Sequence, residues 1–576
     1  MLGIKIHRQE REEISKKVAW GHWFVFFNCI LYILIGSRYA FLIDWPDTLF
    51  GKVYFFISLF GHFSFIVFAF YLLIFFPLSF IIKNNQTYRG LSVIVASLGA
   101  TLMLVDSEIF AHFHFHISNV VWNLLVNPEN GELARQWQLF FVPMPLILLL
   151  EMVFSRWSWQ KLRSLERQKW LKSVGIFFVT MFLATHFIYA WADATLYRPI
   201  TMQKSNFPLS YPMTARSFLE RHGLLDKERY QQQINNQGRA DALSINYPKN
   251  PLIFGEQPSA QPNIVIINLA GWRKDSVTPE QMPYFSKIAQ QGTEFKHHYS
   301  TGNSENVGLT GLFYGLDATY TESILRDQIA SVFISHLHQL KYNIGLFLAP
   351  RKQGSLLNNA LFFNEIHKHK SQYTLKQFNH WQQKQTQPWF AFLSQKLPLY
   401  LSQQEYNQRI HQFDLELHQI FQQIDLSNTL VIVTATQGYN FDNLPPNKLS
   451  NRFSRDLVEV PMFVFWKALK PGKVENLTSH TDVVPALMQH LFNVQNPISD
   501  YAQGYDLFDL THSQSWVLAG NYRWNVIITN KNIQYHIDNH GNYQKYSEHY
   551  QKLSSSQPPL GLFLDVFKQE SSFLKK

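Results

Sequence analysis

The sequence predicts an α-helical membrane bundle of five transmembrane helices, followed by an α/β domain with a largely parallel sheet. Long apolar runs with few charges occupy the first third of the chain, where many of its 49 Phe also lie. Beyond about residue 260, short apolar runs alternate with amphipathic stretches, which is the pattern of an α/β domain. The 576 residues leave room for both parts.

The spans are assigned because a helix of about 20 apolar residues crosses a hydrocarbon core of about 30 Å. They are predicted at residues 19–43, 53–82, 91–105, 139–154 and 174–194. The tail before the first span and the second-to-third and fourth-to-fifth connections are basic, which predicts a cytoplasmic N-terminus. Five spans then predict that the C-terminal domain lies outside the cytoplasm. The first run lacks a small-residue cleavage site and is expected to remain as an anchor.

Polar residues within the spans raise the alternative of a transport path. They are His62, His186, Arg38 and Glu151. Arg38 and Glu151 lie near span ends, where long side chains can reach the interface, and a single histidine usually hydrogen-bonds a neighbouring helix. A structural role is therefore favoured over ion or proton transport.

Three alternating histidines, His112, His114 and His116, would share one face of an extended segment. A metal site is one interpretation. No carboxylate or cysteine stands at ligand spacing nearby, so an interfacial loop is favoured, and neither a metal nor another cofactor is predicted.

The charge and cysteine content narrow the kinds of partner and of covalent cross-link that this chain can have. The net charge is +10, but Lys and Arg are dispersed, so anionic lipid is a better partner than nucleic acid. The one cysteine, Cys29, lies in the first span, which excludes a disulfide within the chain.

The junction after the fifth span is the predicted lipid-binding segment. Pro199, Pro208 and Pro212 prevent a continuing helix, and the next residues form a short amphipathic piece suited to a membrane surface. Arg216 is expected to present its guanidinium, beside free backbone N–H groups of a helix start, to a phosphate. The candidate lipid-binding residues are Thr214, Ala215, Arg216, Ser217 and Arg221.

Ordered blocks in the C-terminal part resemble those of the alkaline-phosphatase and sulfatase superfamily. They include NIVIINLAGW from Asn263, MPYFSKIAQQGTEFKHHYSTGN from Met282, NTLVIVTATQG from Asn428, EVPMFVFW from Glu459 and SHTDVVPAL from Ser479. The resemblance implies a metal-binding Asp after the first strand, a hydroxyl or thiol nucleophile at a helix start, and an Asp-His pair in the TATQG block.

This chain departs from that pattern at each metal position. Ala270 stands at the first Asp, and Thr436 and Gln437 stand at the Asp-His pair. Ser304, beside Glu305, retains a hydroxyl but is expected to be a helix N-cap. A further His expected before the VPMFVFW strand is not evident in NRFSRDLVEVP. No catalytic residue is therefore predicted. His480, Asp482 and Asp414 are expected to cap or pack.

Over its whole length the chain resembles the YejM/PbgA inner-membrane proteins of Gram-negative bacteria. The residues that carry the resemblance include GSRYAFLIDWP, WADATLYRPITMQ, FPLSYPMTARSFLERHGLLD and YAQGYDLFD. The family implies binding of lipopolysaccharide (lipid A) or acidic glycerophospholipid, and control of lipopolysaccharide synthesis and outer-membrane homeostasis through LapB, the cytoplasmic adaptor of the protease FtsH. Where the family commonly has two arginines, this chain has Arg216 and Ser217, and Arg221 is a possible substitute.

The predicted function is a non-catalytic lipid sensor and regulator. The alternatives are a metal-dependent phosphatase or phosphoethanolamine transferase on lipid head groups, and a cardiolipin transporter. The basic cytoplasmic connection predicts contact with the adaptor through Arg163 and Arg167. The predicted divisions are a tail at 1–18, a transmembrane domain at 19–194, an interfacial segment and linker at 195–262, and the sulfatase-like domain at 263–576.

Overall fold

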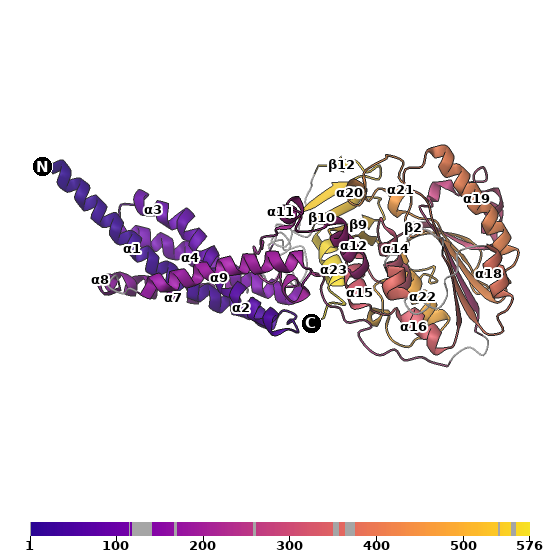
Figure 1. The fold of residues 1–576 in the computed structure, drawn as a ribbon, viewed down its shortest axis with the longest axis horizontal. Coiled ribbons are helices and arrows are strands. Elements are labelled where there is room, and N and C mark those ends of the chain that lie inside the picture. The colour runs from indigo at the N-terminus through magenta and orange to yellow at the C-terminus, as the bar shows by residue number, and fades with distance from the viewer. Residues whose placement is uncertain are drawn as a thin grey trace. The chain divides into compact units, whose positions relative to one another are not determined.

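The structure is a computed structural model that describes residues 2–113, 116–117, 141–165, 170–256, 261–348, 356–362, 375–538, 542–554 and 560–575. The chain divides into two compact units, residues 1–230 with 575–576, and residues 231–574. Figure 1 draws the first unit as helices in indigo to magenta and the second as a mixture of helices and strands.

The first unit contains the apolar helices. They are α1 (Leu2–Gly36), α2 (Leu49–Phe70), α3 (Phe76–Ile81), α4 (Asn85–Phe113), α7 (Met144–Gln160), α8 (Leu162–Leu165) and α9 (Trp170–Ala194). A π-helical turn, Tyr71–Phe75, joins α2 to α3 without a break. Four segments of this unit are long and apolar enough to cross a membrane, Arg11–Phe41, Leu49–Ile81, Asn85–Ala111 and Trp170–Ala194. The predicted fourth span, 139–154, begins outside the described residues, and α7 covers it from Met144 onward.

Glycines allow these helices to approach closely. A Cβ on Gly61 of α2 would lie 2.7 Å from the backbone of Met181 in α9, and one on Gly99 of α4 would lie 2.4 Å from the Tyr32 hydroxyl of α1. Small residues at helix contacts are the usual means of packing in a membrane, where apolar burial gives little drive for association.

The prediction that Glu151 reaches the interface is wrong. Its side chain is fully buried, and Asn28 of α1 donates a hydrogen bond to its carboxyl group at 3.3 Å. Arg38 follows the prediction more closely, because its exposed side chain pairs with Glu108 at 2.8 Å. A carboxyl group in an apolar bundle needs such a donor, and α1 supplies it.

Short helices follow the membrane spans. They are α10 (Arg198–Thr201), α11 (Arg216–Arg221) and α12 (Lys227–Gln237). The polar stretch KERYQQQINNQ was predicted as a tether, yet it forms α12. Tyr230 accounts for part of this, because its ring is buried and its hydroxyl donates to the Asp193 carbonyl at 3.1 Å.

The second unit contains a seven-stranded sheet in the order β3-β4-β1-β5-β6-β2-β7. Its strands are β1 (Asn263–Ala270), β2 (Thr293–Tyr299), β3 (Asn343–Leu348), β4 (Trp389–Lys396), β5 (Thr429–Thr434), β6 (Met462–Phe465) and β7 (Gly472–Ser479). β6 pairs antiparallel with both neighbours, and the other pairings are parallel. The prediction of a largely parallel sheet is confirmed.

Helices cover both faces of this sheet. They are α13 (Pro283–Ile288), α14 (Glu305–Tyr314), α15 (Thr321–Asp327), α16 (Val332–Gln339), α18 (Leu375–Gln382), α19 (Gln403–Phe421) and α22 (Val483–His490). Two shorter helices, α20 (Pro446–Leu449) and α21 (Arg455–Val458), pack instead in a separate core around Tyr299 of β2. Alternate residues of β1 serve separate cores: Ile264 and Ile266 belong to the core with α14 and α22, and Val265 and Ile267 to the core with α19. This follows from the two-residue period of a strand.

A smaller antiparallel sheet, in the order β12-β11-β10-β9-β8, completes the unit and was not predicted. It consists of β8 (Trp516–Gly520), β9 (Trp524–Thr529), β10 (Gln534–Asp538), β11 (Tyr543–Tyr546) and β12 (Lys552–Leu553), and α23 (Leu560–Glu570) follows it. Val517, Ala519 and Val526 of this sheet share a core with Tyr299 of β2, which joins it to the larger sheet.

Candidate functional site

The positions that correspond to a superfamily metal site meet at the carboxyl ends of β1 and β5. Ala270 is the last residue of β1, and Gly271 donates to the Gln437 carbonyl at 2.8 Å. The Thr436 N–H donates to the Asn268 side-chain oxygen, also at 2.8 Å. The fold therefore brings Ala270, Thr436 and Gln437 together.

The start of α14 lies against the same place. Ser304 occupies the N-cap position, but its side chain makes no capping hydrogen bond. A Cβ on Gly308 would lie 2.2 Å from the Thr436 carbonyl oxygen, so the helix backbone rests directly on the loop after β5. We call Ala270, Ser304, Glu305, Thr436 and Gln437 the strand-end corner.

The charge at the strand-end corner is satisfied within the chain. Glu305 is 5% exposed, and its carboxylate pairs with the Lys396 ammonium at 2.9 Å. Lys396 ends β4 and stands in register beside Ala270. The Thr436 hydroxyl and the Gln437 side-chain oxygen are buried without a hydrogen-bond partner among the described residues.

A buried histidine pair lies beside the strand-end corner. His480 Nε2 faces the Ala435 carbonyl at 3.0 Å, and its Nδ1 lies 2.8 Å from His298 Nε2. His480 Nε2 must then carry the hydrogen, so its Nδ1 accepts from His298, whose Nδ1 accepts from the Thr478 hydroxyl at 2.9 Å. Burial lowers the pKa of His480 to about 4, and burial together with His480 lowers the pKa of His298. The two rings are neutral at pH 7, and His480 packs as predicted, while no role had been predicted for His298.

The two aspartates of this region cap, as predicted. Asp414 of α19 accepts hydrogen bonds from the backbone N–H groups of Tyr284 at 3.1 Å and Phe285 at 2.7 Å, at the start of α13. Asp482 accepts from the backbone N–H groups of Ser479 at 2.7 Å and Tyr505 at 2.8 Å. Both carboxylates therefore have a structural role.

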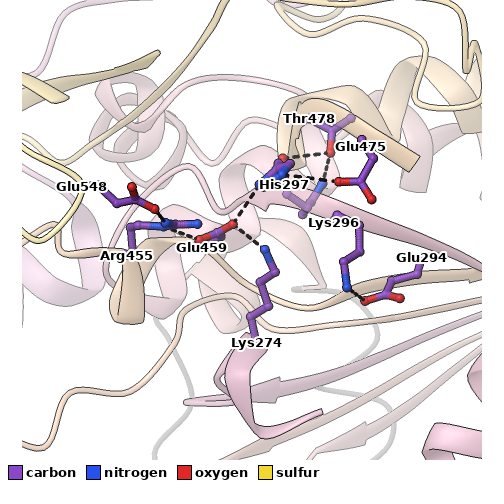
Figure 2. Close-up of polar contacts among 10 residues, drawn as sticks. Lys274, Glu294, Lys296, His297, Arg455, Glu459, Glu475, Thr478 and Glu548 are labelled. Atoms are coloured by element: carbon purple, nitrogen blue, oxygen red, sulfur yellow. Dashed lines mark hydrogen bonds and ion pairs between the residues drawn. The ribbon is translucent and has the colours of Figure 1, made fainter. Parts of the chain in front are cut away.

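A charged network occupies the position before β6, where the superfamily pattern led us to expect a histidine. Glu459 is 5% exposed and pairs with Lys274 and Arg455, each at 2.6 Å, and with His297 at 3.4 Å (Figure 2). Burial raises the pKa of Glu459, but the hydrogen bonds and charges of Arg455 and Lys274 outweigh it and leave that pKa below its usual value. Figure 2 shows these side chains converging from separate parts of the chain on one carboxylate. Sequence reasoning missed this network because its members lie far apart in the chain.

The junction has a different geometry from the one predicted. Arg216 begins α11, and its Nε lies 2.8 Å from an Asp193 carboxylate oxygen near the end of α9. Its guanidinium also lies 5.8 Å from the centre of the Tyr230 ring. The guanidinium of Arg216 was expected to be open to a phosphate, yet it already has an anionic partner.

The other predicted lipid-binding residues surround this pair. Ala215 is the N-cap residue of α11, and Thr214 precedes it, exposed. Arg221 is exposed and its Nε donates to the Ser217 carbonyl at 3.0 Å. Exposed apolar side chains lie on either side of Arg216, Met213 at 44% and Phe218 at 54% exposure. The segment combines basic and apolar exposed groups.

Histidines of the spans hold the chain that leads to α11. His62 Nε2 of α2 lies 2.7 Å from the Pro208 carbonyl, and the Met213 N–H donates to His186 Nδ1 of α9 at 3.0 Å. The predicted partner, a neighbouring helix, is therefore wrong for these contacts. The segment between Pro208 and Met213 is fastened to the helices through its backbone.

His116 makes a similar contact. Its Nε2 lies 2.9 Å from the Ser205 carbonyl and its Nδ1 lies 2.6 Å from the Asp106 carboxylate. The extended segment predicted for the three histidines is wrong at His112, which lies in α4, and His114 lies outside the described residues. Asp106 of α4 is therefore a carboxylate partner of His116, although no carboxylate was expected at ligand spacing near the three histidines. Within the described ranges, no group of three or more His, Cys, Asp or Glu side chains could hold a metal ion.

Comparison with known proteins assigns the family. The chain is 39% identical over 99% of its length to the inner membrane protein YejM of Salmonella typhimurium, and covers 99% of that protein. The chain belongs to the YejM family. It is also 52% identical, over 99% of its length and 98% of the relative, to an uncharacterized protein of Haemophilus influenzae.

Family models match both parts of this YejM-family chain. Residues 7–254 match a domain of unknown function, DUF3413, and residues 252–494 match Sulfatase. Among solved structures, an alkaline phosphatase superfamily protein of Vibrio parahaemolyticus aligns with a TM-score of 0.43 at 11% identity, covering 61% of this chain and 98% of that one. From the match to the Sulfatase model, residues 252–494 form a sulfatase-like domain in an inner membrane protein of the YejM family.

The predicted adaptor-contact residues lie in the connection between α7 and α9. Arg163 belongs to α8 and its side chain is exposed. Arg167 lies outside the described residues. In this YejM-family chain the region also holds Lys161, exposed at the end of α7.

Proposed function

We propose that this protein is a non-catalytic lipid sensor of the bacterial inner membrane. It binds lipopolysaccharide through lipid A, or an acidic glycerophospholipid, at the segment around α11. The observation that carries this is the exposure of Met213 and Phe218 beside Arg216 and Arg221, which matches a ligand with both acyl chains and phosphate.

The proposal includes an orientation and a partner. The basic connections support a cytoplasmic N-terminus and a second unit in the periplasm. The cytoplasmic surface that includes Arg163 and Arg167 then contacts LapB, the adaptor of FtsH, and lipid occupancy at α11 regulates lipopolysaccharide synthesis. The resemblance to YejM supports this assignment.

The chemistry of the strand-end corner supports a non-catalytic role. Ala270 has no ligand atom, and the Thr436 hydroxyl and Gln437 amide are neutral. The carboxylate of Glu305 is occupied by Lys396. A hard divalent ion takes anionic oxygen ligands, so these residues do not fit the metal that the superfamily uses.

The test is binding of lipopolysaccharide to the full chain in nanodiscs. Arg216→Ala should lower the affinity by roughly tenfold or more, because a charge-assisted hydrogen bond to a held phosphate contributes about 1.5–3 kcal/mol. Arg221→Ala should cost less than Arg216→Ala unless Arg221 has taken over from the arginine absent at Ser217. Arg229→Ala, on the exposed surface of α12, is the matched control. If Arg216→Ala, Arg221→Ala and the double variant all bind as tightly as the control, the lipid site lies elsewhere.

A further inference from the structure

A polar cavity of about 270 Å³ lies in the second unit, beside β8 and α23. Its lining includes the side chains of Asp317, Tyr505, His512, Trp516, Asp565 and Gln569. Tyr505 is 44% exposed, so the cavity opens to solvent on that side. Neither Lys nor Arg occurs among the described residues that line it, although the whole chain carries a net charge of +10.

Asp317 is the buried charge of this cavity. Its side chain is 1% exposed, and Gln569 of α23 donates to its Oδ2 at 3.2 Å. One neutral amide donor compensates an ionised carboxylate at this depth only in part for the water it has lost. A ligand that brought a positive charge would supply the rest of that compensation.

A second carboxyl group, that of Glu570, lies near Asp317. Its Oε1 is buried and has no hydrogen-bond partner in the described part of the chain. Burial raises the pKa of Asp317 to about 7, with the nearby Asp482 acting in the same direction. Burial and Asp317 together raise the pKa of Glu570. The site lowers its free energy by taking up positive charge, and it repels an anionic ligand.

Aromatic rings complete the lining. Tyr505 and His512 stack with ring centres 4.1 Å apart, and Trp516 lines the cavity at the start of β8. An aromatic face together with a carboxylate is a combination that attracts organic ammonium groups. A metal ion is the weaker candidate, because the described residues bring together no set of three ligands for one.

We propose that this cavity binds an organic ammonium ion, such as a polyamine or the ammonium of an ethanolamine head group. Asp317 is the counter-ion at the closed end, Asp565 attracts the cation at the open side, and the aromatic rings contact its methylene groups. The volume accepts a chain of several methylene groups. This site is separate from the lipid segment at α11 and does not depend on the proposed lipid binding.

The test is isothermal titration calorimetry of the full chain in detergent at pH 8, with spermidine, putrescine and glycerophosphoethanolamine as probes. Butane-1,4-diol is the uncharged match for putrescine. The amines should bind and the diol should not. Tighter binding of spermidine or putrescine assigns the site to a free amine, and tighter binding of glycerophosphoethanolamine assigns it to a lipid head group.

Variants locate the binding. Asp317→Asn should weaken the amine by roughly tenfold or more, since it removes a charge-assisted hydrogen bond. Asp565→Asn should weaken it by a smaller factor, and because Asp565 is exposed this variant keeps the test decisive if Asp317→Asn fails to fold. Asp425→Asn, at an exposed aspartate beyond α19, is the control. Absence of binding at millimolar amine, equal binding of the diol, or affinities of the folded cavity variants equal to that of the control would overturn the proposal.

Discussion

The ion pair between Arg216 and Asp193 sets up a competition that a single substitution can measure. A lipid phosphate that binds Arg216 must displace the Asp193 carboxylate or share the guanidinium with it. Asp193→Asn removes the competing charge and keeps the size of the side chain. It also keeps the backbone carbonyl that accepts from Tyr230. We therefore expect this variant to bind lipid A more tightly than the parent.

The magnitude follows from the exposure of the pair. The Arg216 side chain is 35% exposed and that of Asp193 is 12% exposed, at a separation of 2.8 Å. Exposed pairs contribute about 0–1 kcal/mol, and partial burial places this pair near the upper end of that range. About 1 kcal/mol corresponds to a gain in affinity of about fivefold.

The assay is lipid A binding to the protein in nanodiscs, arranged as a double-mutant cycle. Asp193→Asn should tighten binding in the parent. It should have no effect in the Arg216→Ala background, because the guanidinium for which Asp193 and the phosphate compete is then absent. Asp226→Asn, at an exposed residue before α12, is the control. Weaker binding by Asp193→Asn would mean that Asp193 positions Arg216 for the lipid, and our reasoning on competition would be refuted.

Four further outcomes are expected. The purified protein should not hydrolyse phosphate or sulfate esters with magnesium, manganese or zinc; a chelator-sensitive rate abolished by Ser304→Ala would contradict this. Reversing the charges of Arg163 and Arg167 should weaken co-purification of LapB without loss of membrane insertion, and unchanged binding would leave these charges a role in topology alone. Asp414→Ala leaves one buried and one partly buried N–H group without their acceptor, so it should lower the stability of the domain by roughly 1–4 kcal/mol in a thermal melt, and an unchanged melt would count against the capping role. Because burial raises the pKa of Asp317 to about 7, the folded state holds that proton more tightly than the unfolded state, and stability falls as pH rises towards 7; the melting temperature of Asp317→Asn relative to the parent should therefore be higher at pH 8 than at pH 5, and a difference independent of pH would contradict the assignment.

The fold was predictable where local patterns are strong. The apolar run from Asn263 becomes β1, and the amphipathic stretch from Tyr406 lies within α19. The capping roles of Asp414 and Asp482 followed from their place in the superfamily blocks. The small sheet from β8 to β12 was missed because its strands are short and several are polar or half-buried, as in β11 (Tyr543–Tyr546), so they carry little hydrophobic periodicity.

The candidate sites were less predictable because they depend on contacts between distant residues. His62 and Pro208 are 146 residues apart, and no local pattern relates them. The partner of Arg216 is Asp193, which the sequence places at the end of an apolar span with no sign that it turns towards α11. A sequence motif identifies a basic residue, but only the fold decides whether that residue is free.

An ion pair within the chain balances the buried charge at the strand-end corner. A buried carboxylate such as Glu305 needs a positive partner, and in this chain Lys396 supplies it from the neighbouring strand. The charge of Glu305 is therefore balanced by another residue of the same chain. An ion pair of this kind suits a protein whose proposed role is to hold a surface for recognition rather than to turn over a substrate.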